Sequence, residues 1–520
     1  MPTHESILSN GYFPRELPPA FTTVSYGSFI KQNLSNLPSG FDNSDLNSKN
    51  AVHNLARRGT LRRKLGIPNP INYYQLASFV CQHWTELFSY ASRSSISLTR
   101  PLDPAPIRAI ADNINKTFSE RAANRARVRS TSRYILQSDI SRFYSSIYTH
   151  SIPWAIHGKS VAKTDRSNAL FGNSLDRLVR NAQDRQTLGI PISPDTSLLI
   201  AEILLSAIDV DLANHRITNG FRIMDDYEFG FKTRAEAEVA LGILQESLNK
   251  YELALNSSKT QILELPLPIE DIGIPELRAL HLSDAGKSGP KTQLYDIIYH
   301  FDRAFELFKE NPEGTFLKYV ISKFRRVTIH SENWSYFEEM LLQSAITEPG
   351  ILSGVLDQLL RHKALGHALT IDRIGDGFNE IIKQHGPLGH GSEVAWAIWG
   401  LLALQIPLEE KSATTAASMN DSIIAILTLD ADKKGLVPSG ANYSNYESFM
   451  TMENLYGEQW LLAYEANVKS WLPSVGTADH VNDDECFNFL KTNGVCFYDD
   501  TLSPHIEPQL PPEPSGEEEY

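Results

Sequence analysis

The stretch "GFRIMDDYEFGF", residues 220–231, places two adjacent carboxylates, Asp225 and Asp226, inside an apolar and aromatic run. Two ionised groups side by side repel each other, and each loses hydration when it leaves water. The β-forming residues on both sides of the pair predict two short strands joined by a tight turn. A pair at such a turn is either solvated or a site for a cation, and this stretch alone favours solvation.

A second acidic site precedes the first by 86 positions, where Asp139 ends the strand-like run "SRYILQSDI", residues 132–140. A carboxylate at a strand end and a carboxylate pair on a distant hairpin are typical of nucleotidyl-transfer sites. In such sites two Mg²⁺ ions about 3.5–4 Å apart bridge the attacking oxygen and the triphosphate. Because carboxylates are hard oxygen ligands, the two stretches together predict a site for Mg²⁺ or Mn²⁺.

Two further stretches fit a nucleotide site. "LGIPISPDTSLLIAEIL", residues 188–204, predicts a loop opening an apolar helix, and Gly189 in that loop lets the backbone approach a base or a sugar closely. "YELALNSSKTQIL", residues 251–263, places Lys259 after a turn. A lysine there is suited to meet the leaving phosphates or to protonate pyrophosphate.

In chain order these stretches resemble the palm of a reverse transcriptase. The order is a strand-end aspartate with an aromatic five residues later (Asp139 and Tyr144), then G-x-x-x-S-P from Gly189, the hairpin pair, and L-N-x-x-K-T from Leu255. Any one of these motifs is weak, but four in order over about 120 residues are a strong signal. The region from 51 to 275, in which helical and β-like runs alternate, is accordingly expected to be α+β.

A narrower resemblance covers most of the chain. Four segments are similar to the abortive-infection reverse transcriptases of bacteria: "GYFPRELPP" (11–19), "ARRGTLRRKLGIPNPINYYQL" (56–76), "FYSSIYTHSIPWAIHGKSVAK" (143–163) and "LGHGSEVAWAIWGLLAL" (388–404). The resemblance implies a fingers–palm core without the usual thumb, followed by an all-α domain of HEAT-like repeats. It also implies template-independent, protein-primed DNA synthesis from dNTPs, a covalently attached single-stranded product, homo-oligomers, and a role in defence against phage.

The resemblance also assigns metal and nucleotide roles. Asp139 and Asp225 would be the metal ligands, Asp226 the accessory carboxylate, and the carbonyl of Ile140 a further ligand. Tyr144 would be a steric gate that excludes a 2′-hydroxyl. Gly189 would sit against the incoming nucleotide. Apart from the resemblance, the basic cluster Arg57, Arg58, Arg62, Arg63 and Lys64 precedes "IPNP" in the expected fingers, and it is interpreted equally well as a phosphate contact or as a solvated helix face.

Two positions depart from the pattern of the family. Ile223 stands where an aromatic residue usually precedes the aspartate pair, and Leu188 stands where a glutamine usually precedes the glycine. Both positions usually lie near the primer or the base pair, so both departures weaken the expectation of ordinary templated copying. Neither removes a metal ligand.

The composition divides the chain into four predicted segments. Residues 1–50 are rich in Pro, Ser and Asn and predict an irregular arm. Residues 51–275 form the predicted fingers and palm, and the Pro-rich "LPLPIEDIGIPE" (265–276) marks its end. Helical spacing of apolar residues over 276–500 predicts the all-α domain, and 501–520 predict a flexible, Pro- and Glu-rich tail. Tyrosines in the arm and the tail are the candidate primers, namely Tyr12, Tyr26 and Tyr520.

Charge and composition set further limits. The net charge is −14, yet residues 1–275 carry 30 Lys+Arg against 26 Asp+Glu, while 276–520 carry 18 against 36. Residues 51–190 alone carry 21 Lys+Arg against 8 Asp+Glu. Such a basic block on an acidic protein favours a local anion site over a long duplex-binding surface. The sequence has no apolar run of about 18 residues and no signal-like N-terminus, and its three cysteines match no zinc or disulfide pattern. We therefore expect no membrane and a cytoplasmic location, and the resemblance implies that the cytoplasm is bacterial.

Several alternatives stay open at this stage. A conventional RNA-templated reverse transcriptase and an inactive palm that serves as a scaffold or nucleic-acid-binding protein are the competing functions. Arg121, Arg125, Arg127 and Arg129 recur on one helical face or alternate on a strand, and a nucleotide contact is the less favoured interpretation of them. "HGPLGHGSE", residues 385–393, is interpreted as a turn and a helix start with Ser392 as its N-cap.

Overall fold

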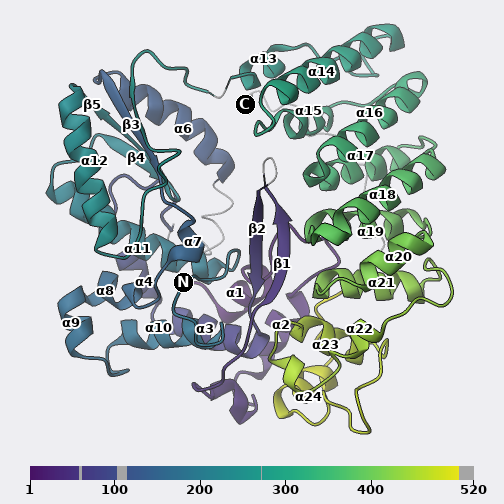
Figure 1. The fold of residues 1–520 in the computed structure, drawn as a ribbon, viewed down its shortest axis with the longest axis horizontal. Helices are drawn as coiled ribbons and strands as arrows, with labels where there is room; N and C mark the ends of the chain where they lie inside the picture. Colours follow the sequence, from purple (N-terminus) through teal and green to yellow (C-terminus); the bar gives the residue numbers. More distant parts are fainter. Residues whose placement is uncertain (58–60, 102–113, 271, 503–520) are drawn as a thin grey trace.

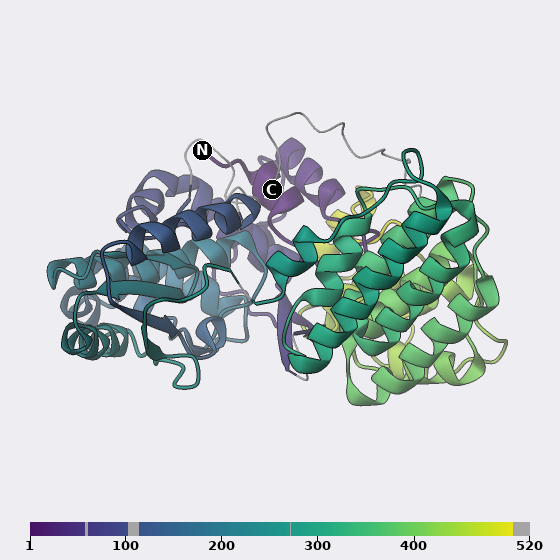
Figure 2. The ribbon, with the colours of Figure 1, turned by 90° about the horizontal axis from the view of Figure 1, so that it is seen from above.

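The computed structural model describes residues 1–57, 61–101, 114–270 and 272–502, and it has two lobes with a β-hairpin between them (Figure 1). The first lobe is mixed α+β, and the second is helical. Figure 2 shows the two lobes side by side, with the N-terminal helices above the seam. Within the described ranges every strand precedes residue 265, as the alternation of helical and β-like runs predicts.

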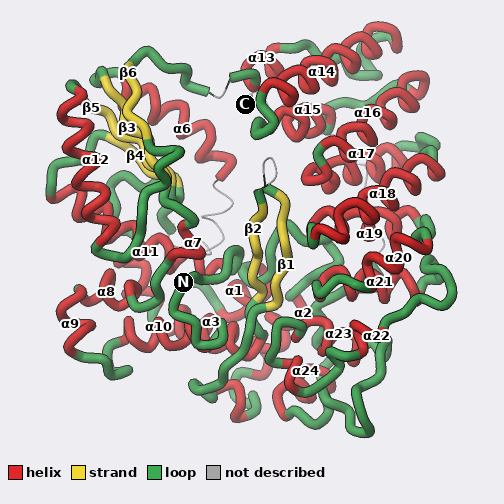
Figure 3. The backbone as a smooth tube through the Cα atoms, in the orientation of Figure 1, coloured by secondary structure: helices red, strands yellow, loops and turns green. Residues whose placement is uncertain are grey.

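The chain up to residue 264 contains the N-terminal helices, the hairpin between the lobes, and a four-stranded sheet with its surrounding helices (Figure 3). Its elements are α1 (His4–Asn10), α2 (Val24–Asn33), η1 (Ser39–Asp42), β1 (Ala51–Ala56), β2 (Arg62–Ile67), α3 (Pro70–Gln82), α4 (Trp84–Ala91), α6 (Ile114–Arg129), β3 (Tyr134–Asp139), α7 (Phe143–Ser146), α8 (Ser151–His157), α9 (Lys159–Thr164), α10 (Phe171–Asn181), α11 (Asp195–Asn214), β4 (Gly220–Ile223), β5 (Asp226–Phe231), α12 (Arg234–Asn249) and β6 (Gln261–Glu264).

The four-stranded sheet has the order β4-β5-β3-β6, and every neighbouring pair is antiparallel. The central strand β3 reads "YILQSD", and its apolar residues Ile135 and Leu136 are fully buried. Helices α6 and α12 pack against this sheet, and α11 packs against α12. The last residue of β3 and the first residue of β5 lie opposite each other at one end of the sheet, and the acidic residues meet there.

The second lobe is a succession of helices along one side of the molecule (Figure 1). Its elements are α13 (Ile274–Ala279), α14 (Pro290–Glu310), α15 (Phe316–Phe324), η2 (Ser331–Asn333), α16 (Trp334–Thr347), η3 (Pro349–Ile351), α17 (Leu352–Ala364), α18 (Ile371–His385), η4 (Gly386–Leu388), α19 (Gly391–Leu404), α20 (Glu410–Ala417), α21 (Ser422–Lys433), α22 (Ser444–Glu447), η5 (Glu453–Leu455), α23 (Trp460–Val468) and α24 (Glu485–Thr492).

Helices of the second lobe that are neighbours in the sequence pack against each other, as α14 does on α15 and α18 on α19. The elements that the structure describes in this lobe are helices, as expected for residues 276–500. HEAT-like repeats in this lobe stay a prediction. None of the helices in the described ranges has both the length and the apolar character that a membrane crossing requires.

The N-terminal segment differs from the irregular arm expected for residues 1–50. It forms α1, which begins with a capping box between Thr3 and Ser6, and α2, which packs on α1. Backbone pairing then ties the segment to the far end of the chain: the Thr22 amide donates to the Phe497 carbonyl at 3.0 Å, and the Asp499 amide donates to the Ala20 carbonyl at 2.8 Å. These contacts hold the segment in the core.

The two candidate primers in this segment are core residues. Tyr12 and Tyr26 are each 0% exposed. Their hydroxyls donate to the carbonyls of Pro68 and Pro70, at 2.5 and 2.7 Å. Because both hydroxyls are buried and hydrogen-bonded, neither can reach a metal site in this fold, and the expectation that they prime synthesis is wrong for this conformation. Tyr520 and the rest of the tail from residue 503 lie outside the described residues.

The hairpin β1–β2 contacts both lobes. Its strand β1 packs on α19 and α21, where buried His53 meets Asp421 through Nδ1 and Oδ2 at 2.8 Å. At the other side, the Gly66 amide donates to the Ile192 carbonyl at 3.3 Å, so β2 also touches the loop before α11. Residues 58–60 at the tip of the hairpin lie outside the described ranges.

We expect Gly27→Ala to lower the stability of the protein. Gly27 lies inside α2, and a Cβ there would sit 2.7 Å from the backbone nitrogen of Ser9 in α1. Separating the two helices to admit the methyl should cost about 1–3 kcal/mol, measurable as a lower midpoint in chemical denaturation.

The matched control is Gly242→Ala inside α12, where a Cβ meets no atom within 4 Å. Removing a helix-interior glycine without a clash should raise stability by about 0.5–1 kcal/mol. Shifts of equal sign in the two variants would contradict close packing of the N-terminal helices.

Candidate metal and nucleotide site

Three carboxylates meet at one end of the four-stranded sheet. Asp139 is the last residue of β3, and it lies directly opposite Asp226, the first residue of β5, in the antiparallel register. Asp225 precedes Asp226 in the turn between β4 and β5. The hairpin expected from "GFRIMDDYEFGF" is confirmed, and it places the pair next to the strand-end aspartate.

The turn itself consists of Met224 and Asp225, and Met224 has a left-handed φ of 52°. Two hydrogen bonds hold this conformation. The Met224 amide donates to the Thr99 hydroxyl at 3.1 Å, and the Met224 carbonyl accepts from the Arg222 guanidinium at 2.9 Å. The position of Asp225 is therefore fixed by residues on either side of the turn.

A buried ion network lies beneath the turn. The Arg222 side chain is 0% exposed, and it donates to Glu202 at 2.7 and 3.1 Å and to Asp209 at 2.9 Å. Both carboxylates come from α11, and the Ser94 hydroxyl donates to Asp209 at 2.6 Å. Burial lowers the pKa of Arg222, but its two anionic partners outweigh burial and raise that pKa well above the usual value.

One guanidinium faces two carboxylates in this network. Burial accordingly raises the pKa of Asp209, while Arg222 and Ser94 oppose the change. Breaking such a buried pair is costly, since it leaves an uncompensated charge inside the protein. The network thus anchors β4 and its turn to α11.

The charges of the three site carboxylates act on one another. Partial burial, followed by the charges of Asp226 and Asp139, raises the pKa of Asp225 to about 6, and Lys259 opposes the change. Burial and then Asp139 also raise the pKa of Asp226, although its side chain reaches solvent, while Arg121 and Lys259 oppose the change. This mutual repulsion is the electrostatic condition that a bound cation relieves.

Asp139 is 8% exposed and is held by two neighbours from the loop before β6. Its Oδ1 accepts from the Asn256 amide group at 2.9 Å, and its Oδ2 accepts from the Lys259 ammonium at 2.8 Å. The side chain of Lys259 remains 53% exposed. Lys259 thus supplies a positive charge to Asp139 in this structure, whereas the sequence predicted a role on the leaving phosphates.

These residues fit a divalent-metal site in their chemistry. All the side-chain donors are carboxylate oxygens, which suit Mg²⁺ and Mn²⁺, and Ile140 follows Asp139 at a buried bridge to Leu255. Among the described residues, however, the three carboxylates do not all approach within 4.8 Å of one another. In this arrangement one oxygen of Asp139 accepts a hydrogen bond from the Lys259 ammonium.

Tyr144 lies beside the carboxylates. Burial, Asp225 and Glu202 raise the pKa of Tyr144 and Arg63 opposes them, so its hydroxyl is near all three charges. That hydroxyl is buried without a hydrogen-bond partner in the described part of the protein. Its ring packs edge-on against Phe143 with centroids 5.3 Å apart. The ring therefore has a fixed position at the edge of the site.

The glycine loop is bonded to the same helical turn as Tyr144. Gly189 has a φ of 85°, its amide donates to the Ile147 carbonyl at 2.7 Å, and the Ile190 amide donates to the Tyr144 carbonyl at 2.9 Å. A Cβ at Gly189 would come within 3.3 Å of the Ser145 carbonyl oxygen. The loop requires glycine for its conformation, and Leu188 beside it is exposed.

The two predicted basic residues of the hairpin take different positions. The charge of Arg63 acts on the pKa of Tyr144, which it lowers against burial and the neighbouring acids. Lys64 lines an open cleft of about 430 Å³ together with Gly189, Leu188 and Ser145. The structure therefore brings Lys64 to the glycine loop and Arg63 within electrostatic reach of Tyr144.

The arginines of α6 separate into two groups. The charge of Arg121 is felt by Asp226. Arg125 and Arg129 instead bind buried Glu228, at 3.1 and 2.9 Å, and also donate to backbone carbonyls of residues 267–269. Arg121 thus acts on a site carboxylate, whereas Arg125 and Arg129 attach the Pro-rich link to the sheet.

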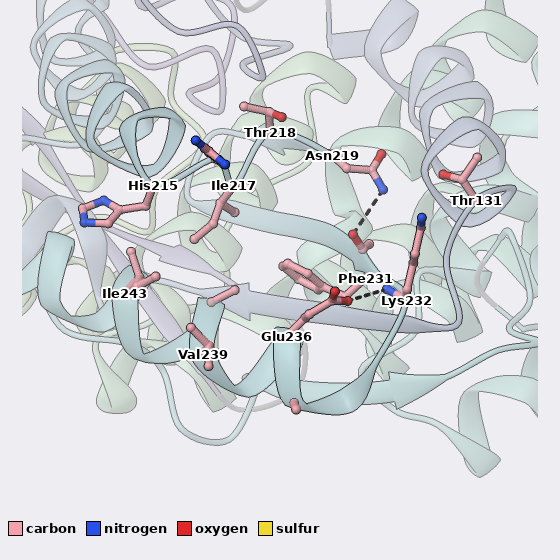
Figure 4. A pocket seen from close by; sticks show the side chains of 14 residues that line it. Thr131, His215, Ile217, Thr218, Asn219, Phe231, Lys232, Glu236, Val239 and Ile243 are labelled. Carbon is pink, nitrogen blue, oxygen red and sulfur yellow. Dashed lines mark hydrogen bonds between the residues drawn. The ribbon is translucent and has the colours of Figure 1, made fainter.

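A broader cleft of about 770 Å³ lies elsewhere on the first lobe (Figure 4). It is formed where β5 and the segment before β4 face α12, and its polar lining includes Asn219, Lys232 and Glu236. None of the three site carboxylates lines it. Size alone therefore does not identify the functional site in this protein.

Sequence reasoning missed the residues that position the site. Arg222, Glu202, Asp209 and Asn256 were not predicted, although each contacts the turn or Asp139 directly or through one partner. Arg222 alternates with apolar residues in a strand, and the two acids lie on the apolar helix α11. Charged residues in such apolar runs are a usable signal, because burial requires each one to find a partner.

Neither a protein-family model nor a curated protein sequence matches the chain. Solved structures to which it is similar include telomerase from Candida albicans in complex with a fragment of telomeric RNA, at 12% identity and a TM-score of 0.31, covering 71% of this chain and 68% of that one. Apo telomerase from Candida tropicalis is similar at 10% identity and a TM-score of 0.31, covering 64% and 70%.

We expect Asp225→Asn to raise the melting temperature of the metal-free protein at pH 7.5, by about 1–3 °C. The pKa of Asp225 in the folded state, about 6, lies above its usual value, so ionising this group costs stability as the pH rises through 6. Below about pH 4 the carboxyl is protonated in both states and that cost is absent. Thermal unfolding in a chelator at several pH values measures the difference.

Asp483→Asn, at an exposed carboxylate in the second lobe, is the control. Adding Mg²⁺ should narrow the gap between Asp225→Asn and the wild type, because a bound cation offsets the repulsion. Equal melting temperatures for the two variants at pH 7.5 would contradict this account of Asp225.

Proposed function

We propose that this protein is a metal-dependent nucleotidyltransferase of the reverse-transcriptase type. One observation carries the proposal: Asp139 and Asp226 lie opposite each other on neighbouring strands, with Asp225 in the adjoining turn, at one end of an antiparallel sheet. Burial and then Asp225 raise the pKa of Tyr144, and Arg63 opposes the change. A scaffold has no use for a carboxylate cluster in which burial and neighbouring charges raise the pKa of Asp225 and Asp226, whereas a metal-dependent transferase requires such a cluster.

Asp139 and Asp225 would hold the ions, with Asp226 as the accessory carboxylate and the carbonyl of Ile140 as a further ligand. When bound, Mg²⁺ supplies charge stabilisation at the triphosphate and favours ionisation of the attacking hydroxyl. Lys259 would leave Asp139 and donate a proton to the departing pyrophosphate. Arg63 would neutralise phosphate charge, and the ring of Tyr144 would occupy the space of a 2′-hydroxyl, which selects dNTPs.

The proposal includes DNA synthesis that needs no template and begins on a protein hydroxyl. In its support, the chain passes after β6 into α13 and a lobe with 18 Lys+Arg against 36 Asp+Glu, which is unsuited to gripping a duplex. Leu188 and Ile223, at positions that usually serve templated copying, support it as well. Because Tyr12 and Tyr26 are buried, Tyr520 is the candidate primer that remains.

The cellular role proposed here follows the resemblance of the sequence to the abortive-infection enzymes. The protein would act in the bacterial cytoplasm as a homo-oligomer, carry a covalently attached single strand of DNA, and limit phage multiplication by halting the infected cell. The HEAT-like interpretation of the second lobe belongs to the same proposal.

The deciding experiment incubates the purified protein with Mg²⁺ and labelled dNTPs, with no template or primer, and resolves the products on a denaturing gel. We expect label that migrates with the protein. Asp139→Asn and Asp225→Asn should reduce incorporation by roughly 100-fold or more, since metal-bound charge stabilisation is worth several kcal/mol. Asp226→Asn should reduce it less.

Other outcomes would select other functions. Synthesis only on added RNA and primer would establish a conventional RNA-templated enzyme. Absence of incorporation under either condition, with Asp225→Asn indistinguishable from the wild type in Mg²⁺ binding, would point to a scaffold. Mass spectrometry of the labelled peptide identifies the primer, and Tyr520→Phe should abolish the label if that residue is used.

We expect Tyr144→Ala to relax the choice between dNTPs and rNTPs by roughly 10- to 100-fold, the scale that steric exclusion in a pocket achieves. The measurement is the ratio of dNTP to rNTP incorporation. Tyr148→Ala is the control, because Tyr148 contacts His150 and Trp154 at centroid distances of 5.0 and 5.6 Å. An unchanged ratio in Tyr144→Ala would show that another residue is the gate.

A further inference from the structure

The segment "HGPLGHGSE", residues 385–393, forms the turn between α18 and α19 and gathers two imidazoles and a carboxylate. α18 ends at His385, and α19 begins at Gly391, so His390 occupies the N-cap position. Ser392 was expected to be the N-cap but lies inside the helix, where its hydroxyl donates to Glu393 at 2.8 Å. The cap expectation is corrected, and the histidines become the notable feature of the turn.

We propose that His385, His390 and Glu393 form a second divalent-metal site, suited to zinc, in the helical lobe. The Nδ1 atoms of the two histidines are 2.9 Å apart. Glu393 Oε1 lies 4.0 Å from Nδ1 of His385 and 3.7 Å from Nδ1 of His390. In the described part of the chain, this is the one group of three such ligands whose donor atoms all lie within 4.8 Å of one another.

The turn brings the three ligands together for local reasons. Gly389 adopts a left-handed φ of 67°, and the His390 amide donates back to the His385 carbonyl at 3.1 Å, which closes the loop over four intervening residues. Glu393 follows His390 by three positions at the start of a helix, and so both side chains share one face. The three donors therefore converge without any rearrangement of the backbone.

The donor set favours zinc over the ions of the carboxylate site. Imidazole nitrogen with carboxylate oxygen suits Zn²⁺, and three protein ligands leave a fourth position for water. Two nitrogens 2.9 Å apart cannot both carry a proton, so at least one already presents a lone pair toward the other.

Arg62 of the hairpin is the competing cation at this site. Its guanidinium contacts Glu393 through its two terminal nitrogens. Nη1 donates to Oε1, and Nη2 donates to Oε2 at 2.7 Å. An ion at Oε1 would replace the first contact and leave the second. Arg62 would then hold the free oxygen of the ligand, a common arrangement around metal-binding carboxylates. Since these residues are distinct from Asp139, Asp225 and Asp226, the inference does not depend on the proposed function.

The test is titration of the full-length, metal-free protein with Zn²⁺ by calorimetry, in excess Mg²⁺ so that the carboxylate site is occupied. We expect one equivalent of Zn²⁺ to bind. His385→Ala and His390→Ala should each weaken binding at least about tenfold, the loss seen even when an outer partner of a ligand is removed. His215→Ala, at an exposed histidine that ends α11, should bind like the wild type.

Two measurements keep the test decisive if a variant folds poorly. Zn²⁺, but not Mg²⁺, should protect His385 and His390 of the wild-type protein from chemical modification of their imidazoles, as read by mass spectrometry. Co²⁺ in place of Zn²⁺ should give the visible bands of a four-coordinate site without a thiolate charge-transfer band. Absence of stoichiometric binding, unprotected histidines, or a thiolate band that assigns the ion to cysteine would each overturn the proposal.

Discussion

The buried guanidinium of Arg222 is the interaction on which the candidate site depends. It joins the β4–β5 hairpin to α11 by binding Glu202 and Asp209, and it also holds the carbonyl of the turn residue Met224. A turn that carries two repelling carboxylates needs such an anchor, because the repulsion would otherwise open it. The buried charges of Arg222, Glu202 and Asp209 thus help to fix the turn that carries Asp225.

The same electrostatic argument explains the state of the site in this structure. Burial, followed by the charges of neighbouring carboxylates, raises the pKa values of Asp225 and Asp226, while Asp139 is paired with Lys259. A lysine that can leave is a suitable partner, since its 53% exposed side chain loses little on moving. Lys259 therefore neutralises Asp139, the least exposed of the three carboxylates at 8% exposure, and can still move away from it.

The parts of the fold set by short-range pattern were predictable. Asp139 at a strand end and Asp225 in a hairpin turn follow from strand periodicity and turn chemistry. The burial of Tyr12 and Tyr26 was not predictable, because it results from pairing between residues near 20 and residues near 498, which no local pattern encodes. The contact of Arg62 with Glu393, 331 positions away, was missed for the same reason.

Successive residues of β2 connect these separate regions. In a strand, neighbouring side chains point to opposite faces. Arg62 therefore reaches Glu393 in the helical lobe while Arg63 acts on Tyr144 beside the carboxylates. A shift of the hairpin along either face must move both arginines together, because they share one backbone. The position of Arg63 is in this way tied to the contact that Arg62 makes with the helical lobe.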